Sequence, residues 1–417
     1  MNTLLITNGL IFDGHAPDLI DGKDLLIEDG HIASISEHVS VPPEGRTIDA
    51  AGKVVMPGLI DAHFHAYATE VNFPLLESLP ITYIAQRARH LVEDTLKRGF
   101  TTVRDAGGAD YGLWRAIEEG YVRGPRLFYC GKAFSQTGGH SDARQSYVEP
   151  CGCALRGNLG QIVDGADALR KAVRENLRQG AHQIKLMVSG GIASPTDPIW
   201  MLQYSEEEIR AAVDEASRRR SYVMAHAYTA ETITRAVQAG VRSIEHANLI
   251  DRHAAEIVAE NGAFVVPTLV TYEALGRAGR DAGVPQVTLD KLKEVREKGL
   301  EAVEICKRAK VKLGFGTDLL GELHKHQLDE LRIRAEIDSP FDVLHSATVV
   351  NAEIIQRSGE LGCIAEGALG DVLIVDGNPL EDLSVLYAAN RGPAYVIKGG
   401  QVVLEPPVGS RTGAVTR

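Results

Sequence analysis

Two histidines, His63 and His65, follow an apolar stretch of the chain. The stretch 54–60 is rich in β-branched residues and is interrupted only by Pro57-Gly58, which is typical of a buried parallel strand. Alternate residues of a strand point to the same side, so both imidazoles should face one point, a geometry that suits a divalent metal ion. An isolated pair of this kind is equally consistent with histidines that pack or cap, so other residues must decide.

Other polar residues stand at or just past the ends of further expected strands. Lys185 lies within an apolar run, where a desolvated ammonium would have to be neutralised, paired or chemically altered. His226, His246 and Asp318 each come at the end of a separate apolar run. Any one of them could be structural, but their joint occurrence at strand ends favours an active site.

The elements that must position these residues alternate strand and helix. The expected strands are 54–60, 101–104, 126–130, 183–188, 222–225, 242–245, 264–266 and 312–316, and the helical patterns include 84–98, 166–179, 206–219, 230–238, 252–260 and 289–309. This α/β pattern, spread over roughly 300 residues, predicts a (β/α)8 TIM barrel with its active site at the C-terminal strand ends. A doubly wound nucleotide-binding sheet is less favoured, because no glycine-rich fingerprint follows the first strand.

Both ends of the chain carry short β patterns separated by turns such as Asn8-Gly9 and Asp29-Gly30. We expect residues 1–56 and 366–417 to pair as one small, discontinuous β-sandwich domain. Residues 57–365 would then form the barrel.

The composition is that of an ordinary globular protein, with 417 residues, 44% hydrophobic and 24% charged. A net charge of −12 argues against nucleic acid or an anionic membrane as a partner. The five cysteines are an odd and sparse number for this length, which fits a reducing compartment. Because no leader or long apolar segment is recognisable either, we expect a cytoplasmic protein. Cys151 and Cys153 lack a second pair at zinc-binding spacing and are interpreted as structural or incidental cysteines and not as metal ligands.

Several motifs resemble the amidohydrolase superfamily, in particular its imidazolonepropionase-like branch of metal-dependent dipeptidases, carboxypeptidases and ochratoxin-type amidases. The resemblance covers essentially the full length. It rests on Lys185 and on the segments 57–65, 99–105, 138–140, 226–228, 245–246, 316–318 and 370–382.

The resemblance implies two divalent metal ions, expected to be Zn²⁺. His63, His65 and Asp318 would hold the more buried ion. The two ions would share a hydroxide that attacks the substrate, while the exposed ion polarises the scissile carbonyl. Asp318 would accept the proton of the hydroxide and pass it to the departing amine, acting as ligand and as acid/base in turn.

His226 and His246 would hold the more exposed ion. Lys185 would bridge both ions as a carbamate derived from CO₂, which resolves the problem of its buried charge. Imidazolonepropionase itself uses one metal and lacks this carbamate, so Lys185 places the chain nearer to the two-metal peptidases.

In those peptidases, the loop after strand three and the tyrosine after strand five hold the substrate. His140 and Tyr228 would therefore bind the α-carboxylate or the scissile carbonyl of a C-terminal amino acid. A mobile loop role for His140 and a packing role for Tyr228 are the alternatives.

Four further residues have simpler interpretations. Arg104 and Asp105 are expected to form a structural ion pair, with a role in substrate binding as the alternative. His324 and His326 follow Asp318 and could face the substrate, but adjacent histidines of this kind are more often solvated surface.

The resemblance implies hydrolysis of a dipeptide or N-acyl amino acid with a free C-terminal carboxylate, and Xaa-Pro dipeptidase is the first choice. An Arg/Lys carboxypeptidase would need an acidic residue in its pocket, which Glu322 or Asp329 could supply. An ochratoxin-type amidase would need a larger apolar pocket. Hydrolysis of a cyclic amide is a further alternative.

A protein of a different class, a catalytically silent barrel used in assembly, would be marked by lost ligands, whereas all six positions are filled here. The expected partners are therefore a small-molecule or dipeptide substrate and, because relatives often form rings or dimers, further copies of the chain.

Overall fold

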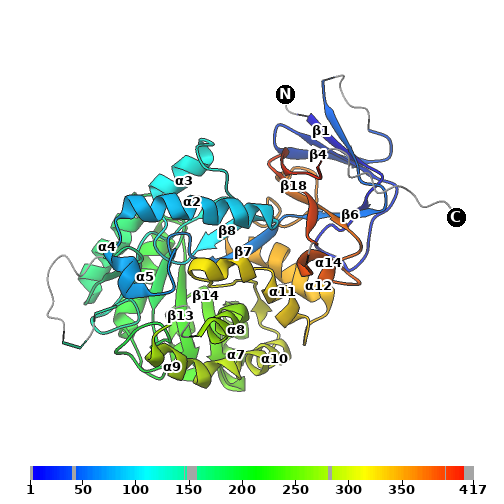
Figure 1. Cartoon of the computed structure of the whole chain (residues 1–417). Helices are drawn as coiled ribbons and strands as arrows, with labels where there is room; N and C mark the ends of the chain where they lie inside the picture. The colour runs from blue at the N-terminus through cyan, green and yellow to red at the C-terminus, as the bar shows by residue number, and fades with distance from the viewer. Residues whose placement is uncertain are drawn as a thin grey trace.

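The structure is a computed structural model that describes residues 3–39, 44–144, 146–147, 157–279, 284–389 and 391–407. Figure 1 shows a large part, in which helices surround strands, and a smaller part made of strands from both chain ends. Cys151 and Cys153 lie outside the described residues.

The first sheet of the smaller part uses only the N-terminal end of the chain, in the order β4-β3-β1-β5. Its strands are β1 (Thr3–Thr7), β3 (Asp24–Glu28), β4 (His31–Ser36) and β5 (Arg46–Asp49). Asp29 and Gly30 form the turn between β3 and β4 with φ angles of 46° and 85°. Positive φ at both positions matches the right-handed twist of a hairpin, which is why an Asp-Gly pair stands there.

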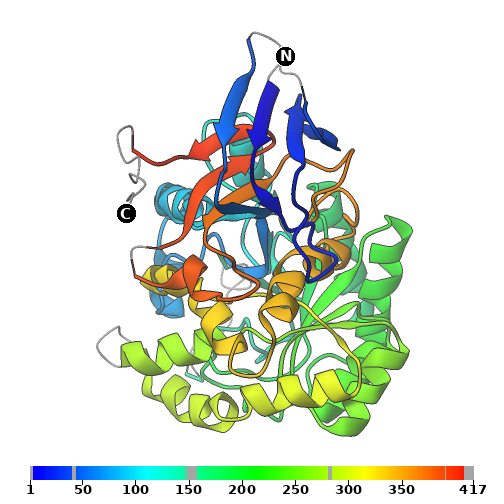
Figure 2. The same ribbon diagram turned by 90° about the vertical axis from the view of Figure 1, so that its right-hand side faces the viewer.

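The second sheet of the smaller part mixes both ends of the chain, in the order β19-β18-β17-β6-β2. Its strands are β2 (Leu10–Ile11), β6 (Lys53–Pro57), β17 (Val372–Asp376), β18 (Pro393–Lys398) and β19 (Gln401–Leu404). β17 runs antiparallel to β6, and Ile374 lies opposite Val55. One hydrophobic cluster contains residues of both sheets, among them Ile6, Ile27 and Val55. Figure 2 shows the N-terminal and C-terminal strands side by side.

Parallel strands form the centre of the larger part. A seven-stranded sheet has the order β11-β10-β12-β13-β14-β15-β16, and a three-stranded sheet has the order β7-β8-β9. The strands are β7 (Leu59–Phe64), β8 (Phe100–Asp105), β9 (Arg126–Phe128), β10 (Ala133–Ser135), β11 (Gly160–Ile162), β12 (Ile184–Met187), β13 (Val223–Thr229), β14 (Ser243–Leu249), β15 (Phe264–Val266) and β16 (Lys312–Leu313). The chain is therefore an α/β protein with parallel sheets, as the alternating pattern predicts.

Single backbone hydrogen bonds join the two parallel sheets. The amide of Ala62 donates to the carbonyl of Phe315 at 2.9 Å, and the amide of His182 donates to the carbonyl of Tyr129 at 2.8 Å. These bonds bring the ends of β7 and β9 to the segments beside β16 and β12.

Helices cover the parallel strands (Figure 1). They are α1 (Phe73–Ser78), α2 (Ile81–Lys97), α3 (Tyr111–Glu118), α4 (Ala166–Arg178), α5 (Glu206–Arg218), α6 (Ala230–Gln238), α7 (Arg252–Glu260), α8 (Leu269–Ala278), α9 (Gln286–Arg296), α10 (Gly299–Arg308), η2 (Gly321–His326), α11 (Asp329–Arg334), α12 (Pro340–His345), η3 (Ser346–Val350), α13 (Asn351–Ile354) and α14 (Ser384–Tyr387). α5 begins with a capping box, in which Ser205 and Glu208 each accept a backbone amide of the other. In the part of the chain that the structure describes, no helix is both long and apolar enough to cross a bilayer.

Two expected elements are each divided in the structure. The strand expected over 54–60 is two strands, β6 in the smaller part and β7 in the larger, and the amide of Gly58 between them donates to Asp371 instead of to a neighbouring strand. The helix expected over 289–309 is α9 and α10, which are separated at residues 297–298. The glycine at 299 weakens helical continuity at that point.

Candidate active site

The polar residues singled out in the sequence meet at the C-terminal ends of the parallel strands. Strand β7 carries His63, with His65 just beyond it; β12 carries Lys185, β13 carries His226, and β14 carries His246. One cavity is lined by all eight expected site residues, namely His63, His65, His140, Lys185, His226, Tyr228, His246 and Asp318.

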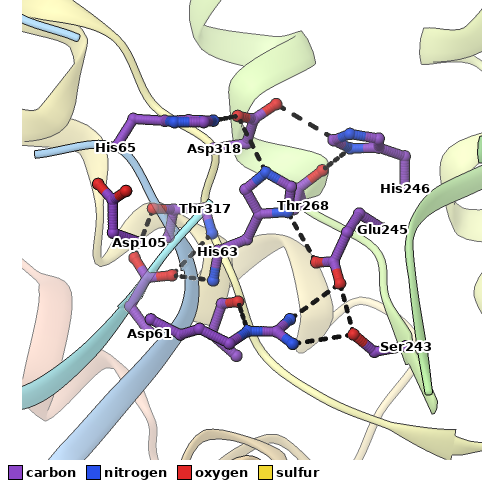
Figure 3. A network of polar contacts seen from close by, with 12 residues as sticks. Asp61, His63, His65, Asp105, Ser243, Glu245, His246, Thr268, Thr317 and Asp318 are labelled. Atoms are coloured by element: carbon purple, nitrogen blue, oxygen red, sulfur yellow. Dashed lines mark hydrogen bonds and ion pairs between the residues drawn. The ribbon is translucent and has the colours of Figure 1, made fainter. Parts of the chain in front are cut away.

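Asp318 is the meeting point of three imidazoles. Its Oδ1 lies 3.1 Å from Nε2 of His65 and 3.4 Å from Nε2 of His63, and its Oδ2 lies 4.0 Å from Nδ1 of His246. Figure 3 shows the carboxylate of Asp318 facing all three rings. Burial alone would raise the pKa of Asp318, but the neighbouring His63 and His65 outweigh burial and hold this pKa well below its usual value. The carboxylate is therefore ionised at neutral pH.

The donor atoms of this cluster are close enough to share an ion. One ligand atom from each of His63, His246 and Asp318 lies within 4.8 Å of the other two. Imidazole nitrogen and carboxylate oxygen are the donors that Zn²⁺ and neighbouring divalent ions prefer. The set of donors thus fits a divalent metal ion.

Lys185 is only 1% exposed and points into the same cavity. Burial lowers the pKa of its ammonium, although the carboxylates of Glu245 and Asp318 act in the opposite direction. An unmodified amine is thereby driven toward its neutral form.

His226 lines the cavity and lies against Gly190 and His246. Its Nε2 donates to the carbonyl of Gly190 at 3.1 Å, and its ring lies 4.6 Å from the ring of His246. Burial, together with the nearby His140 and His246, lowers the pKa of His226 well below its usual value. The ring is neutral, which is the form that binds metals.

His140 and Tyr228 stand beside this cluster. The His140 ring stacks on that of His226, with centroids 4.2 Å apart. Its Nδ1 lies 2.8 Å from Oγ of Ser194 and 3.3 Å from Oδ2 of Asp197. The ring of Tyr228 stacks on that of His246 at 5.3 Å.

A buried ion pair supports the cluster from below. Nδ1 of His63 lies 2.7 Å from Oε2 of Glu245, and Nη2 of Arg104 donates to Oε1 of the same carboxylate at 2.9 Å. Burial would raise the pKa of Glu245, but Arg104 and His63 hold it far below its usual value. Figure 3 shows Glu245 between His63 and Ser243.

The expected ion pair between Arg104 and Asp105 is wrong. Neighbouring residues of a strand point to opposite faces, so these two side chains cannot meet. Arg104 pairs with Glu245 instead. Asp105 accepts the backbone amides of Ala66 and Gly107 at 2.8 and 2.9 Å, and burial raises its pKa to about 6.

Backbone geometry also holds the cluster in place. His246 and Asp318 have φ angles of 78° and 50°, a left-handed conformation that is strained for residues other than glycine and recurs at functional sites. Thr268 meets Nδ1 of His246 at 2.8 Å. Asp61 accepts the amide of His63 at 3.0 Å and the hydroxyl of Thr317 at 2.6 Å, which fixes the residues beside both ligands (Figure 3).

The expectation of two solvated histidines after Asp318 is wrong for His324. This side chain is 2% exposed and its ring lies 4.8 Å from that of Phe64. Residues two apart in η2 point in different directions, so His326 instead lies half-buried and meets Asp329 at 3.2 Å.

A model of the amidohydrolase family matches residues 54–403, and the chain belongs to this family of enzymes that hydrolyse C–N bonds. A structure of a prolidase complexed with N-methylphosphonate-L-proline is 47% identical, with a TM-score of 0.94, over 97% of this chain and 100% of that chain. A Xaa-Pro dipeptidase with bound methionine is 30% identical, with a TM-score of 0.85, over 96% of this chain and 99% of that chain. Ochratoxinase from Aspergillus niger is 29% identical over 97% of this chain and 87% of its own length.

Proposed function

We propose that this protein is a two-metal hydrolase of dipeptides or N-acyl amino acids with a free C-terminal carboxylate, and that its substrates are Xaa-Pro dipeptides. The observation that carries the proposal is the contact of Asp318 with three imidazoles in a cavity that also presents His140 and Tyr228. The similarity to a prolidase and to a Xaa-Pro dipeptidase supports the choice of substrate.

The residues that would hold the metals are those the cavity brings together: His63, His65 and Asp318 for one ion, His226 and His246 for the other, and a carbamate on Lys185 between them. Bound there, two divalent ions, which we propose to be Zn²⁺, would lower the pKa of a water molecule and polarise the scissile carbonyl.

Asp318 would carry the proton during the reaction. Its ionised carboxylate can accept a proton from the attacking water at Oδ2 and deliver it to the nitrogen of the breaking C–N bond. The water oxygen then remains on the acyl carbon, and the amine leaves with the proton.

His140 and Tyr228 would bind the carboxylate of the C-terminal residue. The cavity that they line is largely apolar and includes Ile192, Leu275 and Leu320, which suits the ring of proline. Apolar walls also keep water away from these hydrogen bonds and thereby strengthen them.

Specificity for a basic C-terminal residue is disfavoured. Among the described residues that line the cavity, Glu77 and Asp318 are the only acidic ones. Glu77 already accepts hydrogen bonds from the backbone amides of Asn158 and Leu159. Neither Glu322 nor Asp329 is among those lining residues. The apolar wall instead makes an N-acyl-amino-acid amidase the second candidate, which the similarity to ochratoxinase also favours.

We also propose that the parallel strands close into a (β/α)8 barrel and that the two smaller sheets form a β-sandwich. The bonds from Ala62 to Phe315 and from His182 to Tyr129 support the closure. The hydrophobic cluster shared by the two smaller sheets supports the sandwich.

Hydrolysis of a dipeptide library by the zinc-loaded protein tests the proposal. We expect cleavage of Xaa-Pro and little cleavage of the same peptides with a C-terminal amide. Preferred turnover of N-acyl-phenylalanine would establish the second candidate, and turnover of basic C-terminal residues would overturn both.

A further inference from the structure

A buried carboxylate, Asp197, lies behind His140 and holds the loop 190–198. Asp197 is 0% exposed and accepts three hydrogen bonds, from the amide of Gly191 at 3.1 Å, the side-chain amide of Gln203 at 3.1 Å and the hydroxyl of Ser194. Its Oδ2 also lies 3.3 Å from Nδ1 of His140. The loop is therefore folded around one anion.

A lysine from a distant helix closes the same loop from the other side. Lys291 in α9 donates to the carbonyls of Gly191, Ser194 and Asp197 at 2.9, 2.8 and 2.5 Å. Its Nζ also lies 3.4 Å from Oδ1 of Asp197. With a side chain only 13% exposed, Lys291 links α9 to three carbonyls of the loop.

These contacts determine where the His140 ring can lie. Because Ser194 donates its hydroxyl to Asp197, its oxygen accepts from Nδ1 of His140. Nε2 is thus the ring nitrogen without a partner among the described residues, and the ring itself lies in the cavity wall. Because Nδ1 already donates, Nε2 can donate to a substrate carboxylate only when the ring is protonated, and Asp197 is the anion that faces this charge.

The ring is also confined on its faces. One face stacks on His226 at 4.2 Å with planes 17° apart. On the loop side there is no space for a side chain at Gly191, since an added Cβ would overlap the His140 ring. The amide of His140 is held as well, by Oε1 of Gln203 at 2.9 Å.

We propose that Asp197 and Lys291 are positioning residues that fix the His140 ring for binding the substrate carboxylate. This inference rests on the proposed function, because it needs His140 to meet that carboxylate. A hydrogen bond weakens steeply when its geometry is lost, so a ring freed from Asp197 would bind the carboxylate poorly even though His140 is still present.

A pair of ligands isolates this effect without turnover. N-methylphosphonate-L-proline carries the carboxylate, whereas the same phosphonate on pyrrolidine lacks it. We expect Asp197→Asn to weaken the proline ligand by about 10- to 100-fold in calorimetric titration, the loss typical of a hydrogen bond to a charged group, and the pyrrolidine ligand by less than about twofold.

Two further variants guard against a failure of Asp197→Asn to fold. Gly191→Ala keeps the backbone conformation but pushes the ring away, and Lys291→Met removes the clamp from α9. Both should weaken the proline ligand selectively. The control is Lys293→Met, which removes an exposed lysine of the same helix and should change neither affinity.

Turnover gives the same discrimination. Asp197→Asn and Lys291→Met should raise KM for a free dipeptide and leave kcat and metal content near those of the wild type. Gly191→Ala is assessed with the ligand pair alone, because it can press the ring against His226. Equal losses for both ligands, or loss of bound metal, would show that Asp197 and Lys291 only maintain the fold and would overturn the inference. If the wild-type protein binds the proline ligand no better than the pyrrolidine one, the proposed function itself fails, which is a different result.

Discussion

His63 places its Nδ1 2.7 Å from Oε2 of Glu245, and the two side chains are 1% and 0% exposed. A histidine whose Nδ1 donates to a carboxylate must offer Nε2 as its free nitrogen, and Nε2 of His63 is the atom that faces Asp318. Arg104 in turn holds Glu245 with a buried contact of 2.9 Å. The orientation of His63, an expected metal ligand, therefore depends on Glu245 and, through Glu245, on Arg104.

Glu245→Gln should weaken metal binding by about 10- to 100-fold, because the tautomer of His63 is no longer enforced. It should also destabilise the fold by about 3–5 kcal/mol, since Arg104 is left buried without its counter-charge. Competition with a chelator measures the first effect and urea unfolding the second. Glu207→Gln on the exposed face of α5 is the control. If Glu245→Gln binds metal as tightly as the wild type, Glu245 has no role in metal binding.

Local periodicity explains how much of this site could be predicted from the sequence. Residues two apart on a strand share a face, so the spacing of His63 and His65 predicts that they face one point, and both lie within 3.4 Å of Asp318. Strand ends of a parallel sheet gather at one edge, which placed His246 in the same cluster.

Contacts between distant segments could not be predicted in this way. Lys291 and Asp197 are separated by 94 residues, and no spacing rule links a lysine on a helix to an aspartate in a loop. Adjacency in the sequence suggests Asp105 as the partner of Arg104, whereas the actual partner, Glu245, comes from a strand of the other parallel sheet.

Asp318→Asn should strongly lower turnover while the protein remains folded. The amide cannot accept a proton, so kcat should fall by about 100- to 10,000-fold. The assay compares kcat at equal metal content, with circular dichroism to check folding. Asp329→Asn removes a nearby carboxylate that meets His326 and should leave kcat unchanged. A substantial rate in Asp318→Asn would remove this residue from proton transfer.

Reconstitution of the metal-free protein should depend on CO₂. Burial lowers the pKa of Lys185, and a neutral amine is the form that reacts with CO₂ to give a carbamate. We expect zinc with bicarbonate to restore more bound metal and more activity than zinc in CO₂-free buffer. Lys185→Ala should not respond to bicarbonate. Lys398→Ala is the control, because Lys398 also has a pKa lowered by burial, to about 8, but stands outside the cavity. Full metal loading without CO₂ would argue against the carbamate.

Acid should destabilise the fold partly through His182. Burial lowers the pKa of this imidazole from 6.5 to about 4. Between these two pH values the unfolded chain binds a proton that the folded chain does not, so the free energy of unfolding falls as the pH drops through this window. The loss attributable to His182 is about 3 kcal/mol in total. His182→Gln should therefore show a shallower decline between pH 7 and pH 4.5 in urea unfolding. The exposed His253 provides the control substitution, and identical slopes for wild type and His182→Gln would contradict the prediction.

Tyr228→Phe should impair binding of the substrate carboxylate and little else. Tyr272 donates its hydroxyl to the oxygen of Tyr228 at 3.1 Å, so the hydrogen of Tyr228 is left to donate into the cavity. Loss of one such bond to a carboxylate should raise KM for free dipeptides by about 10-fold or more, with kcat nearly unchanged. Tyr272→Phe keeps that donor and only removes its support, so its effect should be in the same direction but smaller. Steady-state kinetics on each dipeptide and its C-terminal amide separate the two roles. Equal effects of Tyr228→Phe on the free dipeptide and on its C-terminal amide would contradict the prediction. The Tyr228 hydroxyl would then contact the scissile carbonyl or only pack, and His140 would bind the carboxylate without it.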